Sequence, residues 1–343
     1  MSVTINGTTG IVSPHIETTT SSAGSADIRV LNGGQFAFRN KIINGKMEIA
    51  QRGTSFPAIT TGTYSLDRWV VNYVTAGAAT VSQQAIVPAS NEFQNSIRVE
   101  VTTADVSIAA GDVYLLSQAV EGFNIRDLIG RAFTLSFWVR SSKSGVHCVR
   151  FCNSGADRTY VAEYTVNTAN TWEYKTITVS SGLITTGTWN WTNGAGLLVS
   201  FAIAAGANFQ STPNAWQTGN FVATSNQVNV LDTVGNTFYV TGVQLEVGEV
   251  ATPFEHRPYG TELTMCQRYY QTNIIHTVAN SMPNALWHTL QVATRVTPTI
   301  TATLAGGSGT GYATYSATSY GFRYLTDGVA GIADFLVTVS AEL

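Results

Sequence analysis

The sequence predicts an all-β protein with a central jelly-roll β-sandwich, a short linking helix, a small C-terminal β-rich domain and an extended N-terminal arm. Short segments in which apolar and polar residues alternate dominate residues 39–260. Gly, Asn, Ser and Thr turns separate these segments, and no long amphipathic helix interrupts them. Pro253 and Pro258 then end the last strand of this region, and the apolar period changes. A chain of 343 residues also exceeds the usual ~100–200 residues of one domain.

Residues 1–38 are predicted to form an extended N-terminal arm. They are rich in Thr, Ser and Gly and contain only short apolar stretches. Segments below ~40 residues rarely fold alone, so we expect the arm to become ordered against a partner or against other copies of the chain. The alternative is a disordered leader.

Residues 39–260 are predicted to form the jelly-roll domain. The clearest strands place apolar side chains at every second position: Ile97, Val99 and Val101; Phe133, Leu135, Phe137 and Val139; Leu197, Val199, Phe201 and Ile203. In the last strand the same alternation assigns to one face Tyr239, Thr241, Val243, Leu245 and Val247. We also expect three tryptophans to be core residues, namely Trp69, Trp138 and Trp172.

Residues 261–271 are predicted to form the linking helix. Leu263, Cys266 and Tyr270 follow the i, i+3, i+7 spacing of one helical stripe, and Thr261 stands where a cap is expected. Two interpretations remain open for this stripe. It packs against equivalent helices around a three-fold axis, or it lies on its own subunit.

Residues 272–343 return to a strand pattern and are predicted to form the distal, β-rich tip. Ile300, Ala302 and Leu304 share one face, and Phe335, Val337 and Val339 share another. The Gly-rich stretch at 306–311 lacks the Lys of a phosphate-binding loop, so we expect an ordinary loop there.

Composition excludes several classes of partner. The 18 basic and 21 acidic residues give a net charge of −3, and no basic run is present, so nucleic acid is not expected as a ligand. No stretch reaches the ~18 apolar residues of a membrane span, so membrane insertion is not expected. The N-terminus lacks the features of a secretory signal, which predicts synthesis in a cytoplasm. All three cysteines are predicted to be free thiols.

Five segments, in this order, resemble a family of bacteriophage and prophage tail-fibre proteins. They are NKIINGKMEIAQRG (40–53), YSLDRW (64–69), FTLSFWVRSS (133–142), VTGVQLEVGEVATPFEHRPYG (240–260) and ELTMCQRYYQ (262–271). The resemblance implies a non-enzymatic receptor-binding subunit of a virion tail fibre, made in the host cytoplasm. It also implies a homotrimer, attachment to the phage tail or baseplate through residues 1–38, and a jelly roll similar to carbohydrate-binding modules.

The same resemblance implies one metal. Similar carbohydrate-binding modules carry a structural Ca²⁺ held by a Glu after the opening Asn-Gly and by an Asp beside the last strand. Glu48 matches the first position, but Thr241 and Gly242 stand where the Asp is expected. No other cofactor is predicted.

The residue types favour binding over catalysis. No nucleophile elbow or zinc-protease motif is present. Polysaccharide cleavage would need two carboxyl groups ~5–9.5 Å apart, for which the central domain offers Glu48, Asp67, Asp105, Asp112, Glu121, Asp157, Glu163 and Asp232. We therefore expect a binding protein without catalysis. The alternatives are a tailspike-like polysaccharide depolymerase and a structural spacer or decoration protein of the virion.

Two sets of residues are candidates for contact with a host-surface glycan, because sugar sites combine aromatic platforms with hydrogen-bonding groups. The tip set has aromatic and cationic side chains near Gly-rich loops: Trp287, His288, Tyr312, Tyr315, Tyr320, Phe322, Arg323 and Tyr324. The second set is a platform in the central domain: Trp189, Asn190, Trp191 and Trp216.

Overall fold

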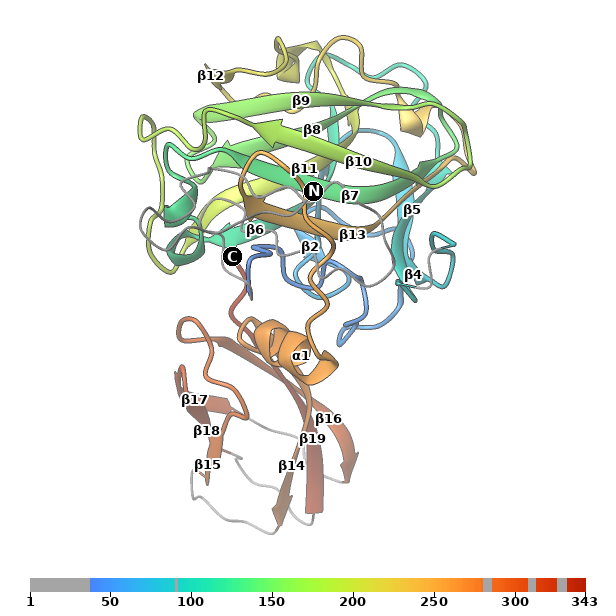
Figure 1. The fold of residues 1–343 in the computed structure, drawn as a ribbon. Helices are drawn as coiled ribbons and strands as arrows, with labels where there is room; N and C mark the ends of the chain where they lie inside the picture. Colours follow the sequence, from blue (N-terminus) through green and yellow to red (C-terminus); the bar gives the residue numbers. More distant parts are fainter. Residues whose placement is uncertain (1–37, 90–91, 280–285, 308–312, 326–331) are drawn as a thin grey trace, which may run out of the picture.

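The prediction of an all-β protein is confirmed. A computed structural model describes residues 38–89, 92–279, 286–307, 313–325 and 332–343, and describes the backbone alone at 273–279, 286, 304–307, 313–315, 324–325 and 332–333. A two-sheet sandwich lies above one short helix and two smaller sheets (Figure 1). The predicted N-terminal arm, apart from Phe38, lies outside these residues.

The first sheet of the sandwich has six antiparallel strands. In spatial order they are β1 (Ser55–Phe56), β4 (Ala78–Gln84), β5 (Ser96–Thr103), β13 (Thr237–Val247), β7 (Phe133–Ser141) and β10 (Glu173–Val179). β13 is the last strand of the sandwich in sequence, yet it lies in the middle of the sheet, between β5 and β7.

The second sheet has seven strands. In spatial order they are β12 (Trp216–Thr218), β9 (Arg158–Val166), β8 (Gly145–Asn153), β11 (Ala195–Ala205), β6 (Val113–Glu121), β3 (Val70–Val74) and β2 (Thr63–Tyr64). Four 3-10 turns lie in the connections: η1 (Gly122–Asn124), η2 (Arg126–Leu128), η3 (Ala207–Phe209) and η4 (Val230–Asp232).

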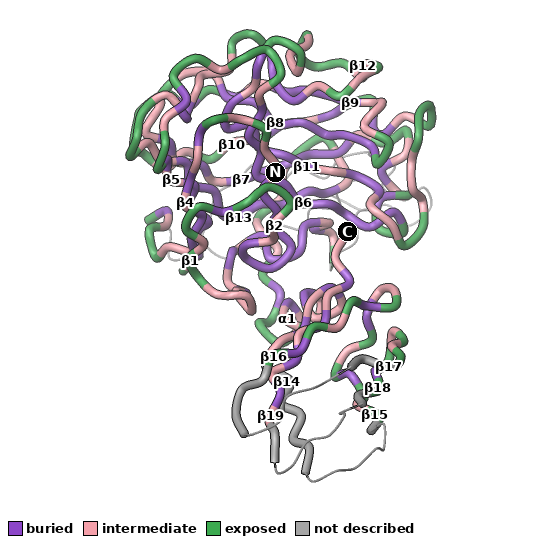
Figure 2. Tube along the Cα trace, turned by 180° about the vertical axis from the view of Figure 1, so that it is seen from behind, coloured by how far each residue is buried: buried purple, intermediate pink, exposed green. Residues whose placement is uncertain are grey.

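The inner faces of the two sheets form the main core. The three predicted alternating segments supply its centre, and Phe137, Phe201 and Phe238 are fully buried there. Trp69 is buried as predicted. Figure 2 shows this buried layer running along β6, β8 and β11. The predicted alternation of these three segments is confirmed, because one face of each strand packs against the opposite sheet.

The predicted alternation of β13 is wrong at one point. Its pairing with β7 shifts between Thr241 and Gln244, so a bulge inserts an extra residue. Val240 therefore joins Val243 and Leu245 in the core, whereas Tyr239 and Thr241 face outward. Trp138, paired with Thr241, also lies on the outer face and is only partly buried, which corrects its assignment to the core.

The outer face of the second sheet is covered by the chain itself. The connection from β11 to β13 lays Val222 and Ala223 over apolar side chains of that face. Polar side chains there are also paired, since Arg150 donates to Ser200 and Asn220. The outer face of the first sheet is covered over β13 by the segment that follows this strand, where Thr252 and Glu255 donate hydrogen bonds to Glu246 and Gln244. Tyr174 of β10 remains exposed.

The linking helix is shorter than predicted and begins earlier. α1 spans Tyr259–Gln267, has Pro258 at its N-cap, and ends before Tyr270, which is the first residue of β14 (Tyr270–Ala279). Tyr270 pairs with Ser340 in the sheet, and the helix therefore lacks the last turn that the stripe predicted. Cys266 is buried against Ile43 and Ile49 of the same chain.

The C-terminal domain consists of two three-stranded sheets. One contains β14, β19 (Ile332–Ser340) and β16 (Thr299–Gly307), and the other contains β15 (Leu286–Thr289), β18 (Gly321–Leu325) and β17 (Ala313–Thr318). Between them lies a small core that includes Phe322, Phe335, Val337 and Val339. Ile300 and Ala302 pack into it as the alternation predicted.

The two domains are joined by a polar network as well as by α1. The Glu342 carboxylate pairs with the buried Arg68 and, at 2.9 Å, with Arg52. Arg268 donates to Glu121 of the sandwich at 2.8 Å, and Arg295 donates to the carbonyl of Asn193. These contacts fix the orientation of the C-terminal domain on the sandwich.

Candidate functional site

The sheet β15–β18–β17 presents an exposed face, which we call the distal face: Trp287, Thr289, Ser316, Thr318, Tyr320 and Arg323. Trp287 and Ser316 are both paired directly with Arg323, so the three side chains share one side of the sheet. Trp287 is 47% exposed and Tyr320, in the turn between β17 and β18, is 68% exposed. This face combines flat apolar rings with hydroxyls and one cation.

Gly321 fixes the position of the Trp287 indole. A Cβ atom at residue 321 would lie 2.8 Å from Cε2 of Trp287 and 2.4 Å from the carbonyl oxygen of His288. The indole therefore lies over the glycine backbone, where no other residue would fit.

Two predicted tip residues point inward. Phe322 is fully buried, and the His288 ring lies 5.1 Å from it. Burial lowers the pKa of His288. Their place in the sheet explains this outcome, because both alternate with the exposed pair Trp287 and Arg323.

The remaining tip residues are tyrosines. Tyr324 lies in β18, where it pairs with Leu286 and Thr314, and Tyr315 lies at the irregular step between Thr314 and Ser316. Their side chains are outside the described part of the structure, and Tyr312 lies outside it entirely.

The three tryptophans of the predicted platform do come together. The Trp189 and Trp191 rings are stacked at 5.1 Å, and Trp216 meets Trp189 edge-on at 5.8 Å. All three pack against the main core, and the indole N–H groups of Trp189 and Trp216 donate to backbone carbonyls. Asn190 accepts bonds from Thr192 and Gly194 and so stabilises its own turn. Much of this surface is used within the protein.

The carboxylates considered for catalysis have structural partners. Asp67 accepts from Gln51, Glu121 pairs with Arg268, and Asp232 pairs with Lys143. Burial raises the pKa of Asp67, whereas the pKa of Asp157 is lowered, chiefly by the hydrogen bond from Asn153. These four carboxylates therefore have partners within the protein.

The Glu48 side chain has a basic partner within the protein. Its carboxylate pairs with Lys46 at 3.0 Å. At the second expected position, Thr241 donates to the carbonyl of Asn95, and Gly242 has no side chain. Among the described residues, no group of three His, Cys, Asp or Glu side chains converges. The donor set therefore does not fit the hard, oxygen-rich coordination that Ca²⁺ requires.

The sequence did not predict a second exposed aromatic surface on the sandwich. A pocket of about 350 Å³ opens on the outer face of the first sheet, and we call it the outer pocket. It is lined by Glu92, Phe93, Ser136, Trp138, Tyr174, Gly242, Pro253 and Phe254. These residues come from four separate parts of the chain, so only the outward position of Trp138 in its alternating strand could have indicated the pocket.

Comparisons with known proteins identify structural similarity but no sequence family. No family model matches the chain, and no curated protein matches it. Bacteriophage CBA120 tailspike protein 4 is similar over 61% of this chain, with 14% identity and a TM-score of 0.32. This chain spans only 21% of that tailspike chain.

Two carbohydrate-binding modules are similar at the same level. TmCBM61, solved with β-1,4-galactotriose, is covered over 99% of its length by 61% of this chain, with 14% identity and a TM-score of 0.30. The family 11 module of Clostridium thermocellum, solved with a mixed-linked tetrasaccharide, is covered over 99% by 58% of this chain, with 11% identity and a TM-score of 0.32. At these values the matches identify neither a ligand nor a reaction.

No helix in the described part of the chain is long and apolar enough to cross a bilayer.

Proposed function

We propose that this protein is a non-enzymatic receptor-binding subunit of a phage tail fibre, and that its distal face binds a glycan of the host cell surface. The observation that carries the proposal is the exposed Trp287 beside Arg323 on a sheet face edged by hydroxyls. Aromatic and arginine side chains are the usual anchors of recognition surfaces. Thr and Ser hydroxyls supply the hydrogen bonds that sugar hydroxyls need.

The rigidity of this face supports the proposal. A ligand gains affinity from side chains that are already held in place, because less conformational entropy is lost on binding. The indole lies directly over the Gly321 backbone, and the network around Glu342 holds the whole domain against the sandwich. Attachment of residues 1–38 to the phage tail or baseplate, homotrimer formation and location in the virion belong to the same proposal and rest on the sequence resemblance.

Binding to purified host-envelope polysaccharides, measured by biolayer interferometry, tests this function. Trp287→Ala should weaken binding by about 30-fold, since truncation of a central aromatic anchor costs ~2 kcal/mol or more. Arg323→Ala should weaken it as well. The matched control is Phe123→Ala, because Phe123 is a 55% exposed aromatic in a turn of the sandwich. Equal binding by Trp287→Ala and the control would refute the assignment.

The two alternatives give different results in the same samples. A depolymerase would release reducing sugar from the polysaccharide over time. A spacer or decoration protein would bind none of the polysaccharides, with or without the substitutions. Mass measurement of the intact oligomer tests the three-fold assembly directly.

A further inference from the structure

We propose that the outer pocket is a second carbohydrate site, separate from the distal face, that takes a neutral pyranose unit. Its volume of about 350 Å³ lies at the lower end of the ~300–1,000 Å³ of ligand pockets. That size suits one ring of an oligosaccharide whose remainder extends into solvent. The proposal does not depend on the function of the distal face.

The floor of the pocket is an aromatic surface on the sheet. Tyr174 of β10 is paired directly with Trp138 of β7, and their ring centroids lie 5.4 Å apart. Tyr174 is 44% exposed although it is a large aromatic residue on a sheet. The planes of the two rings are inclined by 51° to each other, so the rings are not stacked and form an open, V-shaped surface. A sugar ring can place its apolar C–H face against them.

The facing wall is formed by Phe93 and Phe254, which meet edge to face at 5.3 Å. The bulge in β13 creates the space for this wall. Gly242 lies at φ +61°, and a Cβ atom there would be 2.7 Å from Cζ of Phe93. The bulge also turns Thr241 toward Asn95, whose carbonyl accepts a 2.7 Å hydrogen bond from the Thr241 hydroxyl. The loop that carries Phe93 is thereby tied to the sheet.

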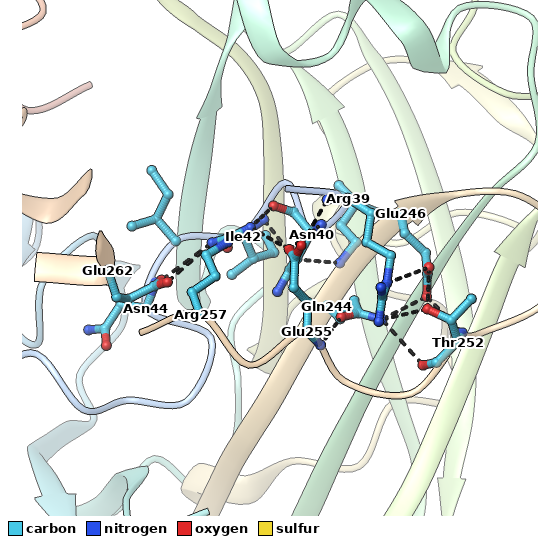
Figure 3. A network of polar contacts seen from close by, with 12 residues as sticks. Arg39, Asn40, Ile42, Asn44, Gln244, Glu246, Thr252, Glu255, Arg257 and Glu262 are labelled. Carbon is cyan, nitrogen blue, oxygen red and sulfur yellow. Dashed lines mark hydrogen bonds and ion pairs between the residues drawn. The ribbon is translucent and has the colours of Figure 1, made fainter. Parts of the chain in front are cut away.

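The segment that carries Pro253 and Phe254 is held by the polar network in Figure 3. Glu246 accepts bonds from the backbone and hydroxyl of Thr252, at 2.8 and 2.6 Å. The backbone N–H of Glu255 donates to Gln244 at 2.8 Å. Residues on both sides of Phe254 are therefore fixed to the outer face of β13. The pocket is formed before ligand binding.

The charge of the lining selects the class of sugar. Glu92 is the only ionisable carboxylate or cation among the lining residues, and it can accept hydrogen bonds from sugar hydroxyls. The Ser136 hydroxyl adds a second polar group at the floor. With no lysine or arginine in the lining, a uronic acid or sialic acid would meet a like charge without a compensating cation. A neutral hexose or N-acetylhexosamine meets no such cost.

Titration of the full-length protein with methyl glycosides and disaccharides of glucose, galactose, mannose and N-acetylglucosamine tests the proposal. Binding is followed by saturation-transfer NMR and isothermal calorimetry. Tyr174→Ala should weaken binding of the sugar that binds by about tenfold, because the ring contact is lost. Tyr174→Phe keeps the ring and should bind within about threefold of wild type. Trp287→Ala, on the distal face, should leave this binding unchanged.

Trp138→Phe gives an independent readout. If a sugar lies on the floor, it should change the tryptophan fluorescence of the wild type, and this change should be lost in Trp138→Phe. Absence of binding by every neutral sugar, equal affinity of Tyr174→Ala and wild type, or preferential binding of glucuronate would each overturn the proposal. The converse substitution separates the two sites, since Tyr174→Ala should leave polysaccharide binding by the distal face intact.

Discussion

The carboxylate of Glu342 is predicted to carry much of the coupling between the two domains. Its side chain is 8% exposed and pairs with Arg68, which is 1% exposed, and with Arg52, which is 12% exposed. Glu342→Gln preserves the shape of the side chain but removes its charge. The Arg68 guanidinium would then lose its ionic partner but keep the Ala119 carbonyl at 2.7 Å, the Tyr269 ring at 3.6 Å and its hydrogen bond with Tyr64.

The expected loss can be estimated from this burial. Removing one partner of a buried ion pair costs ~3–5 kcal/mol, because the other charge is left in a poorly solvated position. Because Arg68 keeps its other contacts, we expect the free energy of unfolding to fall by about 3 kcal/mol, the lower end of this range. The matched control is Glu100→Gln, the same chemical change in a pair with Arg98 whose side chains are 21% and 35% exposed. Solvent screening limits that loss to ~1 kcal/mol or less.

Urea unfolding followed by circular dichroism measures both losses, and limited proteolysis of residues around α1 reports on the joint. The Glu342 variant should unfold at lower urea and be cleaved faster at the joint, whereas the Glu100 variant should resemble the wild type. If the two variants lost the same free energy of unfolding, the joint would not depend on this charge.

Three further predictions concern buried residues. Gly242→Ala should destabilise the protein by ~1–3 kcal/mol, since it combines a left-handed backbone with a clash against Phe93; unchanged urea unfolding would contradict this. Burial lowers the pKa of His147 in the folded state, so its contribution to stability should fall as the pH drops below ~6.5, by at most ~1.4 kcal/mol per pH unit. His147→Phe should show a smaller loss between pH 7.5 and 5, and parallel curves would argue against this cause. Thiol reagent should label no cysteine in the native state and label all three after unfolding, because all are buried: Cys148, Cys152 and Cys266.

Much of the fold followed from local patterns. Alternation along β7 and β11 predicted the core faces correctly, because a strand between two sheets exposes each second side chain to the same environment. The free state of the three cysteines also followed, since the spacing of Cys148 and Cys152 along one strand forbids a disulfide. The side-chain alternation of a strand and the distance between two cysteines on one strand both depend only on local backbone geometry.

Errors arose where distant segments compete for the same residues. Tyr270 fits a helical stripe, yet its pairing with Ser340, 70 positions later, draws it into β14. A one-residue bulge reversed the faces of Tyr239 and Thr241, which period-2 reasoning cannot anticipate. His288 fits a recognition surface by residue type, but its strand turns it toward Phe322.

The sequence by itself determined an all-β chain, the core-facing side of most predicted strands and a low content of charged residues, because these properties follow from composition and from the period of the strand. The tertiary structure alone decided which aromatic residues reach solvent. Trp189 and Trp191 stack on each other, whereas Trp138 and Tyr174 line the outer pocket opposite Phe93 and Phe254. The physical reason is that a pocket is a property of several segments packed together, and no segment encodes the position of the others.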